Sequence, residues 1–300
     1  MNNFKNLAIL LLSVMIIVQS AILLYFLRSQ KTGPRPVAAR QAASPERVVA
    51  APRPEPVVPA APLRPQLPVV PAGKIALIID DWGYNLKNSD FISGNDFSLT
   101  LAVLPFREYS GRIAEMAQQS GKDVIIHMPM EPHHKEQYGL EENTLLTTMP
   151  SSQVTRLLNE AFADVPHAKG VSNHMGSRAT EDARLMRAVM GYLKNKGMFF
   201  VDSLVTSKSV CRATAASIGE NFASRDVFID NEDDPDAIRQ QMVSLARVAK
   251  KKGLAVGIGH DRPQTIAVLK EMIPALREQG YEFVNISEIV RHEARQKKGR

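Results

Sequence analysis

The stretch KIALIIDDWG, residues 74–83, is an apolar run that ends in two adjacent carboxylates. Residues Ile75–Ile79 are apolar throughout, which predicts a strand covered on both faces, as in a parallel sheet. Adjacent side chains of a strand face opposite sides, but a turn at Gly83 can bring Asp80 and Asp81 to the same end. Two neighbouring carboxylates can divide the work of ligating a cation and acting as a base. The alternative is an Asp-rich turn that caps a helix.

The same pattern, an apolar run followed by an acidic residue or a histidine, recurs along the chain. The expected strands after the first are 99–104, 124–126, 170–171, 198–201, 227–229, 254–258 and 282–285. The polar residues at the strand ends are Asp80, Asp81, His127, His174, Asp202 and His260. Helices are expected between the strands, which predicts a (β/α) barrel or a doubly wound sheet. The spread of polar strand ends favours the barrel, because a barrel brings these ends together at one face.

Helix boundaries are expected at residues that satisfy free backbone groups. The expected helices are 108–119, 154–162, 180–196, 235–252 and 263–279. Ser151 or Ser152, Thr180 and Asp234 are the predicted N-caps of the second, third and fourth of them.

Each polar strand end also has a structural interpretation. His127 fits a structural histidine, Asp202 fits a helix cap, and His260 fits a loop histidine bonded to the backbone. Their recurrence at one topological position favours a site, and carboxylates with imidazoles are what a metal-assisted hydrolase needs. The acidic run 230–234 lacks the spacing of a calcium loop, so it is interpreted as a helix-capping turn.

The first 73 residues differ from the rest. Residues 1–30 contain the uncharged run Leu7–Leu27, long enough to span a bilayer, which predicts an uncleaved membrane anchor. Residues 31–73 are rich in proline and alanine and predict a semi-extended linker. Residues 74–290 are expected to form the folded domain and 291–300 a basic tail. A further hypothesis makes the linker itself a docking segment in polyproline conformation.

The formal net charge of +6 comes from outside the expected domain. Residues 1–73 carry eight Lys or Arg against two acidic residues, and the remainder of the chain is neutral overall. A nucleic-acid-binding protein is expected to carry a basic patch on its folded domain, so no nucleic-acid partner is predicted. The only cysteine, Cys211, excludes an internal disulfide.

Five motifs in this order resemble the divergent polysaccharide deacetylases. They are IIDDWG (78–83), HMPMEP (127–132), NHMGS (173–177), FVDS (200–203) and GHDRPQT (259–265). The resemblance covers residues 74–290 and implies a deformed (β/α) barrel of seven or so strands. It also implies N-deacetylation of an acetylated amino sugar with a divalent metal ion, for which zinc is the expected identity.

The resemblance also implies roles for individual residues. Asp80 would be the base, Asp81 and His127 metal ligands, and His260 the general acid. Glu131 stands where the family pattern places a second histidine, and His174 is expected to replace that ligand. Asp202 or Arg178 is expected to orient these groups.

These expectations combine into one hypothesis and one alternative. The first is a metal-dependent N-deacetylase of an envelope polysaccharide or peptidoglycan-type glycan, held in the inner membrane by its N-terminal helix. The positive-inside rule argues for a cytoplasmic domain, but the resemblance and the long linker favour a periplasmic one. The alternative is a non-catalytic module that keeps the fold and binds a glycan or a partner protein, as the altered histidine motif suggests.

Overall fold

The computed structural model describes residues 71–137 and 139–298. The expected anchor and almost all of the expected linker lie outside these residues. Within the described part, no helix combines the length and the apolar character needed to cross a membrane.

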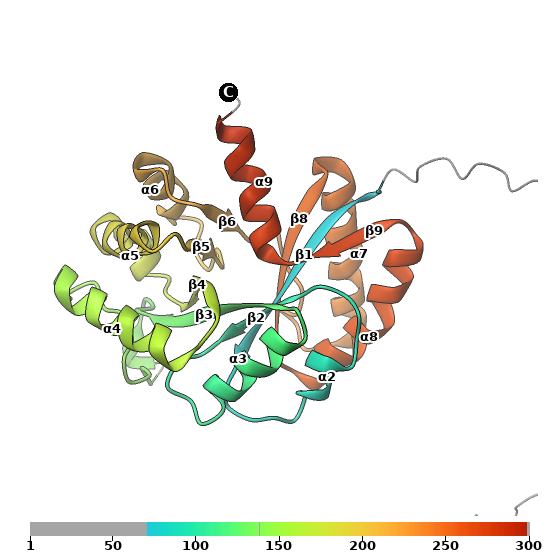
Figure 1. Ribbon diagram of the computed structural model, residues 1–300, viewed down its shortest axis with the longest axis horizontal. Coiled ribbons are helices and arrows are strands. Elements are labelled where there is room, and N and C mark those ends of the chain that lie inside the picture. Colours follow the sequence, from blue (N-terminus) through green and yellow to red (C-terminus); the bar gives the residue numbers. More distant parts are fainter. Residues whose placement is uncertain (1–70, 138, 299–300) are drawn as a thin grey trace, which may run out of the picture. The chain divides into compact units, whose positions relative to one another are not determined.

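In the described residues, nine strands form one sheet, and every pairing between them is parallel (Figure 1). The strands are β1 (Gly73–Trp82), β2 (Thr100–Val103), β3 (Asp123–Met130), β4 (Ala168–Met175), β5 (Phe199–Asp202), β6 (Phe222–Ser224), β7 (Val227–Phe228), β8 (Leu254–His260) and β9 (Tyr281–Val284). Their order is β6-β5-β4-β3-β2-β1-β8-β7. β9 pairs with the first part of β1, and β2 pairs with its last part. Among the described residues no pairing joins β6 to β7, so the expected barrel is open along this seam.

The helices other than α9 (Ile286–Lys298) lie around the outside of the sheet, and α9 rises from its middle (Figure 1). The outer helices are α2 (Asp90–Ser93), α3 (Ser110–Gln119), α4 (Ser151–Asp164), α5 (Ala183–Asn195), α6 (Cys211–Ile218), α7 (Pro235–Lys252) and α8 (Pro263–Glu278), with short 3-10 turns at Lys135–Gln137 and Ala179–Glu181.

Two of the predicted N-caps are wrong. Thr180 lies in a 3-10 turn, where its hydroxyl donates to the Gly176 carbonyl, and Asp182 caps α5 instead. α4 begins at Ser151 itself, so Pro150 occupies the cap position and no side chain caps the helix. The Asp234 cap of α7 is confirmed, since its carboxylate accepts hydrogen bonds from two backbone amides.

The apolar side chains of the sheet form two cores. Along β1, Ile75, Leu77 and Ile79 face the outer helices, while Ala76 and Ile78 face the barrel interior. This alternation follows from the two-residue period of a strand. Both faces are buried, which is why the run carries no polar residue before Asp80.

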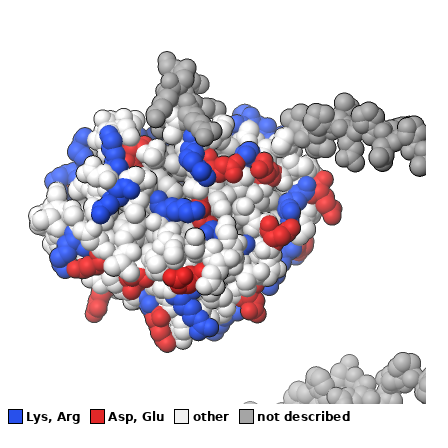
Figure 2. Space-filling model, viewed as in Figure 1, with Lys and Arg blue, Asp and Glu red and all other residues white. Residues whose placement is uncertain are grey.

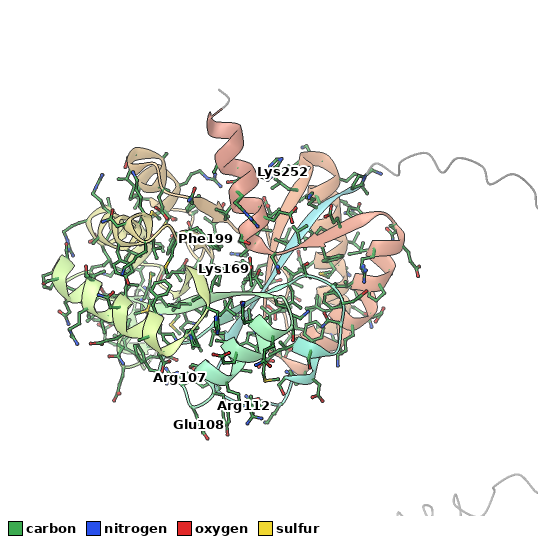
Figure 3. The ribbon with its side chains drawn as sticks, viewed as in Figure 1. Arg107, Glu108, Arg112, Lys169, Phe199 and Lys252 are labelled. Atoms are coloured by element: carbon green, nitrogen blue, oxygen red, sulfur yellow. The ribbon has the colours of Figure 1, made fainter. Side chains whose placement is uncertain are left out.

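Helix α9 closes the amino-terminal end of the barrel interior. Ile286, Ile289 and Val290 are buried in the inner core, and burial of such side chains contributes roughly 1.5–3 kcal/mol each. Lys169 and Phe199 lie beside the start of this helix and line a hollow with it (Figure 3). The expected basic tail is therefore the continuation of a helix that begins inside the domain.

The face of the domain that carries α9 mixes charges of both signs. Figure 2 shows Lys and Arg side chains interspersed with Asp and Glu side chains over this face. Some of them form ion pairs, such as Lys74 with Glu282 at 3.4 Å and Lys252 with Asp226 at 2.6 Å.

Candidate metal centre

Asp81 occupies an unusual backbone conformation at the carboxyl end of β1. Its φ angle is +66°, and the pairing of β1 with β2 shifts register between Ile79 and Trp82. Asp is among the few residues that tolerate this left-handed region. This irregularity brings the Asp81 carboxylate to the same end of β1 as Asp80, as the sequence predicts. The backbone changes direction at Asp81 itself, however, and not at Gly83.

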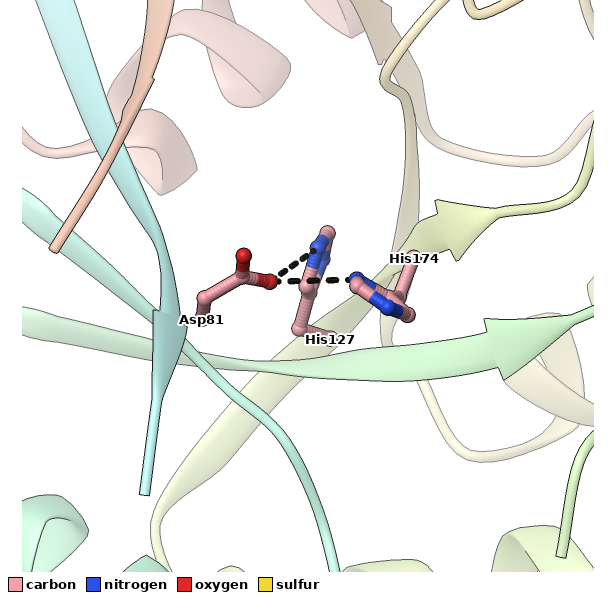
Figure 4. Close-up of side chains that lie close together, drawn as sticks. All are labelled: Asp81, His127 and His174. Atoms are coloured by element: carbon pink, nitrogen blue, oxygen red, sulfur yellow. Dashed lines mark ion pairs between the residues drawn. The ribbon is translucent and has the colours of Figure 1, made fainter. Parts of the chain in front are cut away.

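Three donor atoms from three strands converge at this end of the sheet (Figure 4). Asp81 Oδ1 lies 3.0 Å from His174 Nδ1 and 3.4 Å from His127 Nε2. The three atoms all lie within 4.8 Å of one another. The predicted grouping of Asp81, His127 and His174 is therefore present in the fold.

His127 is held in the orientation that a ligand needs. On β3, His127 pairs in register with Ser172 of β4, and the His127 Nδ1 atom lies 2.8 Å from the Ser172 hydroxyl. This contact leaves Nε2 facing Asp81. Burial, together with the neighbouring His174, lowers the pKa of His127 well below its usual value, so the imidazole is neutral and has a lone pair for a metal.

The residues present fit a divalent metal ion. Asp81 Oδ1 is buried and accepts no hydrogen bond of good geometry, although two imidazole nitrogens face it. Burial alone would raise the pKa of Asp81, but His174, His127 and His260 outweigh it and keep the pKa far below its usual value. Two imidazoles and one carboxylate form the donor set of many catalytic zinc sites, which leave one position open for water.

Asp80 directly precedes Asp81 on β1 and is buried. Its Oδ2 is 3.5 Å from His127 Nε2, and its Oδ1 has no hydrogen-bond partner. Burial and the nearby carboxylates of Asp81 and Asp230 raise the pKa of Asp80 well above its usual value. A carboxylate with a raised pKa is a stronger base than one in water, which suits proton abstraction.

His260 stands opposite Asp80 because β8 pairs with β1 in register at these two residues. Its Nε2 lies 3.9 Å from Asp81 Oδ2, and its Nδ1 lies 2.9 Å from Asp230 Oδ1. Asp230 is completely buried and also accepts from the His260 amide and the Thr265 hydroxyl. The sequence interpretation of Asp230 as part of a capping turn missed this contact.

The match with known proteins decides the family. Residues 77–290 match the family model of divergent polysaccharide deacetylases. The chain belongs to this family. A Haemophilus influenzae protein, described as uncharacterised, is 35% identical over 220 residues, which are 73% of this chain and 78% of that protein.

The Escherichia coli protein YibQ, also described as uncharacterised, is 35% identical over 202 residues. This match covers 67% of the present chain and 63% of YibQ, so the chain spans less than two thirds of that relative. A crystal structure of an uncharacterised Agrobacterium tumefaciens protein has the same fold, with a TM-score of 0.69, 20% identity, and coverage of 74% of this chain and 90% of that one.

Glu131 contributes none of the converging donor atoms. Its buried carboxylate accepts from the Thr147 amide and hydroxyl at 2.7 Å, and Lys135 lies 3.2 Å away. Arg178 lies 3.6 Å from the same carboxylate and is half exposed. The structure therefore places Arg178 beside Glu131, at the base of the loop between β3 and α4.

Asp202 contacts its own loop. It accepts hydrogen bonds from the Leu204 amide at 2.8 Å and from the Ser209 hydroxyl at 2.7 Å. Arg225, which the sequence interpretation missed, follows β6 at the open seam. Burial lowers the pKa of Arg225, while the nearby carboxylates of Asp80 and Asp202 raise it. The positive charge of the Arg225 guanidinium thus compensates part of the negative charge of the buried Asp80.

Proposed function

We propose that the protein is a metal-dependent N-deacetylase of an envelope polysaccharide that carries N-acetylated amino sugars. The observation that carries this proposal is the convergence of Asp81, His127 and His174 between two further groups, Asp80 and His260. Such a centre has what amide hydrolysis requires, namely a metal site, a base and an acid. The family description supports a glycan as the substrate.

Asp81, His127 and His174 would hold the ion, for which zinc is the expected identity. When bound, the ion would polarise the acetamide carbonyl and lower the pKa of a coordinated water molecule. Asp80 takes one proton from the attacking water, whose oxygen forms the new bond to the carbonyl carbon. His260 donates a proton from Nε2 to the amine nitrogen as the C–N bond breaks. The products are acetate and the free amino sugar.

The location of this reaction belongs to the proposal as well. Residues 1–30 would anchor the protein in the inner membrane, with the domain in the periplasm. A peptidoglycan-type glycan is then a substrate within reach of the linker, at about 3.1 Å per extended residue.

The test compares metal content and acetate release in the full-length protein and two histidine variants. The wild type is expected to bind near-stoichiometric zinc and to release acetate from N-acetylglucosamine oligomers. His174→Gln removes a donor atom, so it should lose the metal and the activity. His167→Gln is the matched control, because this exposed histidine contacts Glu115 and not the metal centre, and it should behave as wild type.

Two outcomes would contradict parts of the proposal. Stoichiometric metal in His174→Gln would remove His174 from the ligand set. A wild-type protein that binds metal and glycan but releases no acetate would favour the non-catalytic alternative.

A further inference from the structure

Exposed apolar side chains gather around the metal centre. Six large hydrophobic side chains are exposed in the described part of the chain, and five of them lie at the ends of β1, β3, β4 and β5 or in the loops that follow. They are Tyr84, Leu140, Met175, Leu204 and Val205, with exposures between 37% and 48%. The sixth, Val243, is on α7. Since the carboxyl ends of parallel strands meet at one face, the five lie on the face that holds Asp81.

Two of these side chains are presented by a strained backbone. Met175 and Leu204 have φ angles of +53° and +50°, a region that long side chains avoid and that persists only where the surroundings enforce it. Met175 directly follows His174, so its position is tied to the metal centre.

A set of buried polar groups enforces both conformations. The Asn173 side chain, which is 1% exposed, donates to the Met175 carbonyl at 2.8 Å and accepts from the Ser203 amide at 2.9 Å. Leu204 is fixed from both sides, since its amide donates to Asp202 and its carbonyl accepts from Arg225 at 2.8 Å. One asparagine therefore joins the two loops. We call Met175, Leu204 and the adjacent Val205 the rim segment.

The chemistry of this rim segment indicates what it contacts. Proteins that bind sugar rings through apolar contacts use aromatic faces, whereas Met175, Leu204 and Val205 are aliphatic. Their side chains have no group that forms a strong hydrogen bond with a sugar hydroxyl. The only tryptophan, Trp82, is fully buried. An exposed aliphatic segment beside a catalytic centre is complementary to hydrocarbon.

We propose that Met175, Leu204 and Val205 form an apolar subsite and that the substrate is amphiphilic, an N-acetylated amino sugar that carries a hydrocarbon chain. This inference rests on the proposed deacetylase function, because the subsite adjoins the same metal centre. The occupant is part of the substrate, since the residues adjoin the metal ligand His174 and the loop of Asp202. Elsewhere on this face, the Tyr84 hydroxyl and the Arg107–Glu141 ion pair are polar groups that suit the sugar.

The test compares two glycosides of N-acetylglucosamine, one with a methyl and one with an octyl group, below the micelle concentration. The full-length zinc-loaded protein is expected to deacetylate the octyl glycoside with a kcat/KM about tenfold higher, the gain for burying roughly two methylene groups. In Leu204→Asn this ratio should fall toward unity. Asn tolerates a positive φ, so this variant removes hydrocarbon and keeps the backbone. Val243→Asn, the control on α7, should keep the wild-type ratio.

The outcomes separate this inference from the proposed function. Equal kcat/KM values for the two glycosides in the wild type, or an unchanged ratio in Leu204→Asn, would overturn the apolar subsite and leave the deacetylase intact. If neither glycoside is hydrolysed, the deacetylase proposal fails on these substrates. Calorimetric affinities of the same two glycosides then decide the subsite, and equal affinities would reject it.

Discussion

At the scale of single residues, Asp230 is the group whose removal is most informative. Burial would raise its pKa, but the hydrogen bond to His260 and the contact with Thr265 outweigh this and lower the pKa below its usual value. An ionised carboxylate beside Nδ1 keeps Nε2 of His260 pointed at the centre. Asp230 acts through His260 and is thus a positioning residue.

Asp230→Asn should keep the metal and lower kcat by roughly 10²–10³-fold, the usual range for weakening general acid catalysis. The loss should fall on kcat with KM unchanged, because Asp230 acts through His260 and does not touch the substrate. A purely structural role would also lower the metal content or raise KM. Asp236→Asn, an exposed residue at the start of α7, is the control and should have wild-type kinetics.

The sequence predicts most of this centre, and the parts it misses share a physical reason. Asp80, Asp81, His127, His174 and His260 follow apolar runs, so their position at strand ends is visible in the pattern. Asp230 and Arg225 follow short strands near the open seam, in runs of charged residues. Which member of such a run turns inward depends on tertiary burial, which no local pattern records.

At the scale of elements, the approach of β4 to β5 depends on Gly170. A Cβ atom at this position would lie 2.5 Å from the Phe199 carbonyl oxygen on the neighbouring strand. Gly170→Ala should therefore destabilise the fold by about 1–3 kcal/mol or more, since the two strands must move apart. Gly191→Ala on α5 is the matched control, because a Cβ atom there meets no neighbour. This change should stabilise the fold by about 1 kcal/mol, since alanine favours the helix over glycine. Urea denaturation measures both changes, and equal stability of the two variants would contradict the explanation.

The elements also show where local rules are sufficient. The Asp234-Pro235 start of α7 satisfies both a capping preference and a proline preference, and it is predicted correctly. For α5, Thr180 and Asp182 are competing caps, and only the 3-10 turn that precedes the helix selects Asp182. In α9, the apolar residues that pack against the domain all lie at the start of the helix. The charged residues that follow show no amphipathic pattern, so the sequence does not predict this helix.

At the scale of the whole molecule, the free energy of unfolding should depend on a buried carboxyl that is not part of the metal centre. Glu220 is 4% exposed, neither of its oxygens has a hydrogen-bond partner, and it lines a cavity of about 280 Å³ with residues of α6 and α9. Burial raises the pKa of Glu220 to about 8, from an ordinary value of 4.5. The folded state therefore binds the proton more tightly than the unfolded state.

Glu220 should lower the stability as the pH rises from about 4.5 to about 8, by at most about 5 kcal/mol. Below this range the carboxyl is protonated in both states, and above it the loss is complete. Denaturation of Glu220→Gln, which cannot ionise, should show a smaller loss across this interval. Glu278→Gln, an exposed residue at the end of α8, should follow the wild type. Identical pH profiles for all three proteins would disprove this account.

The position of β1 in the sheet has a consequence for how the chain folds. β1 is an interior strand of the sheet, where Lys74 pairs with Leu254 of β8 and Ile75 pairs with Phe283 of β9. Most of its backbone partners are therefore contributed by the last part of the domain. Contacts of such long sequence separation form slowly. An unpaired apolar strand is prone to aggregate until its partner strands have formed. A nascent chain that already contains the Asp80-Asp81 pair must be protected from misassociation until nearly the whole domain has been synthesised.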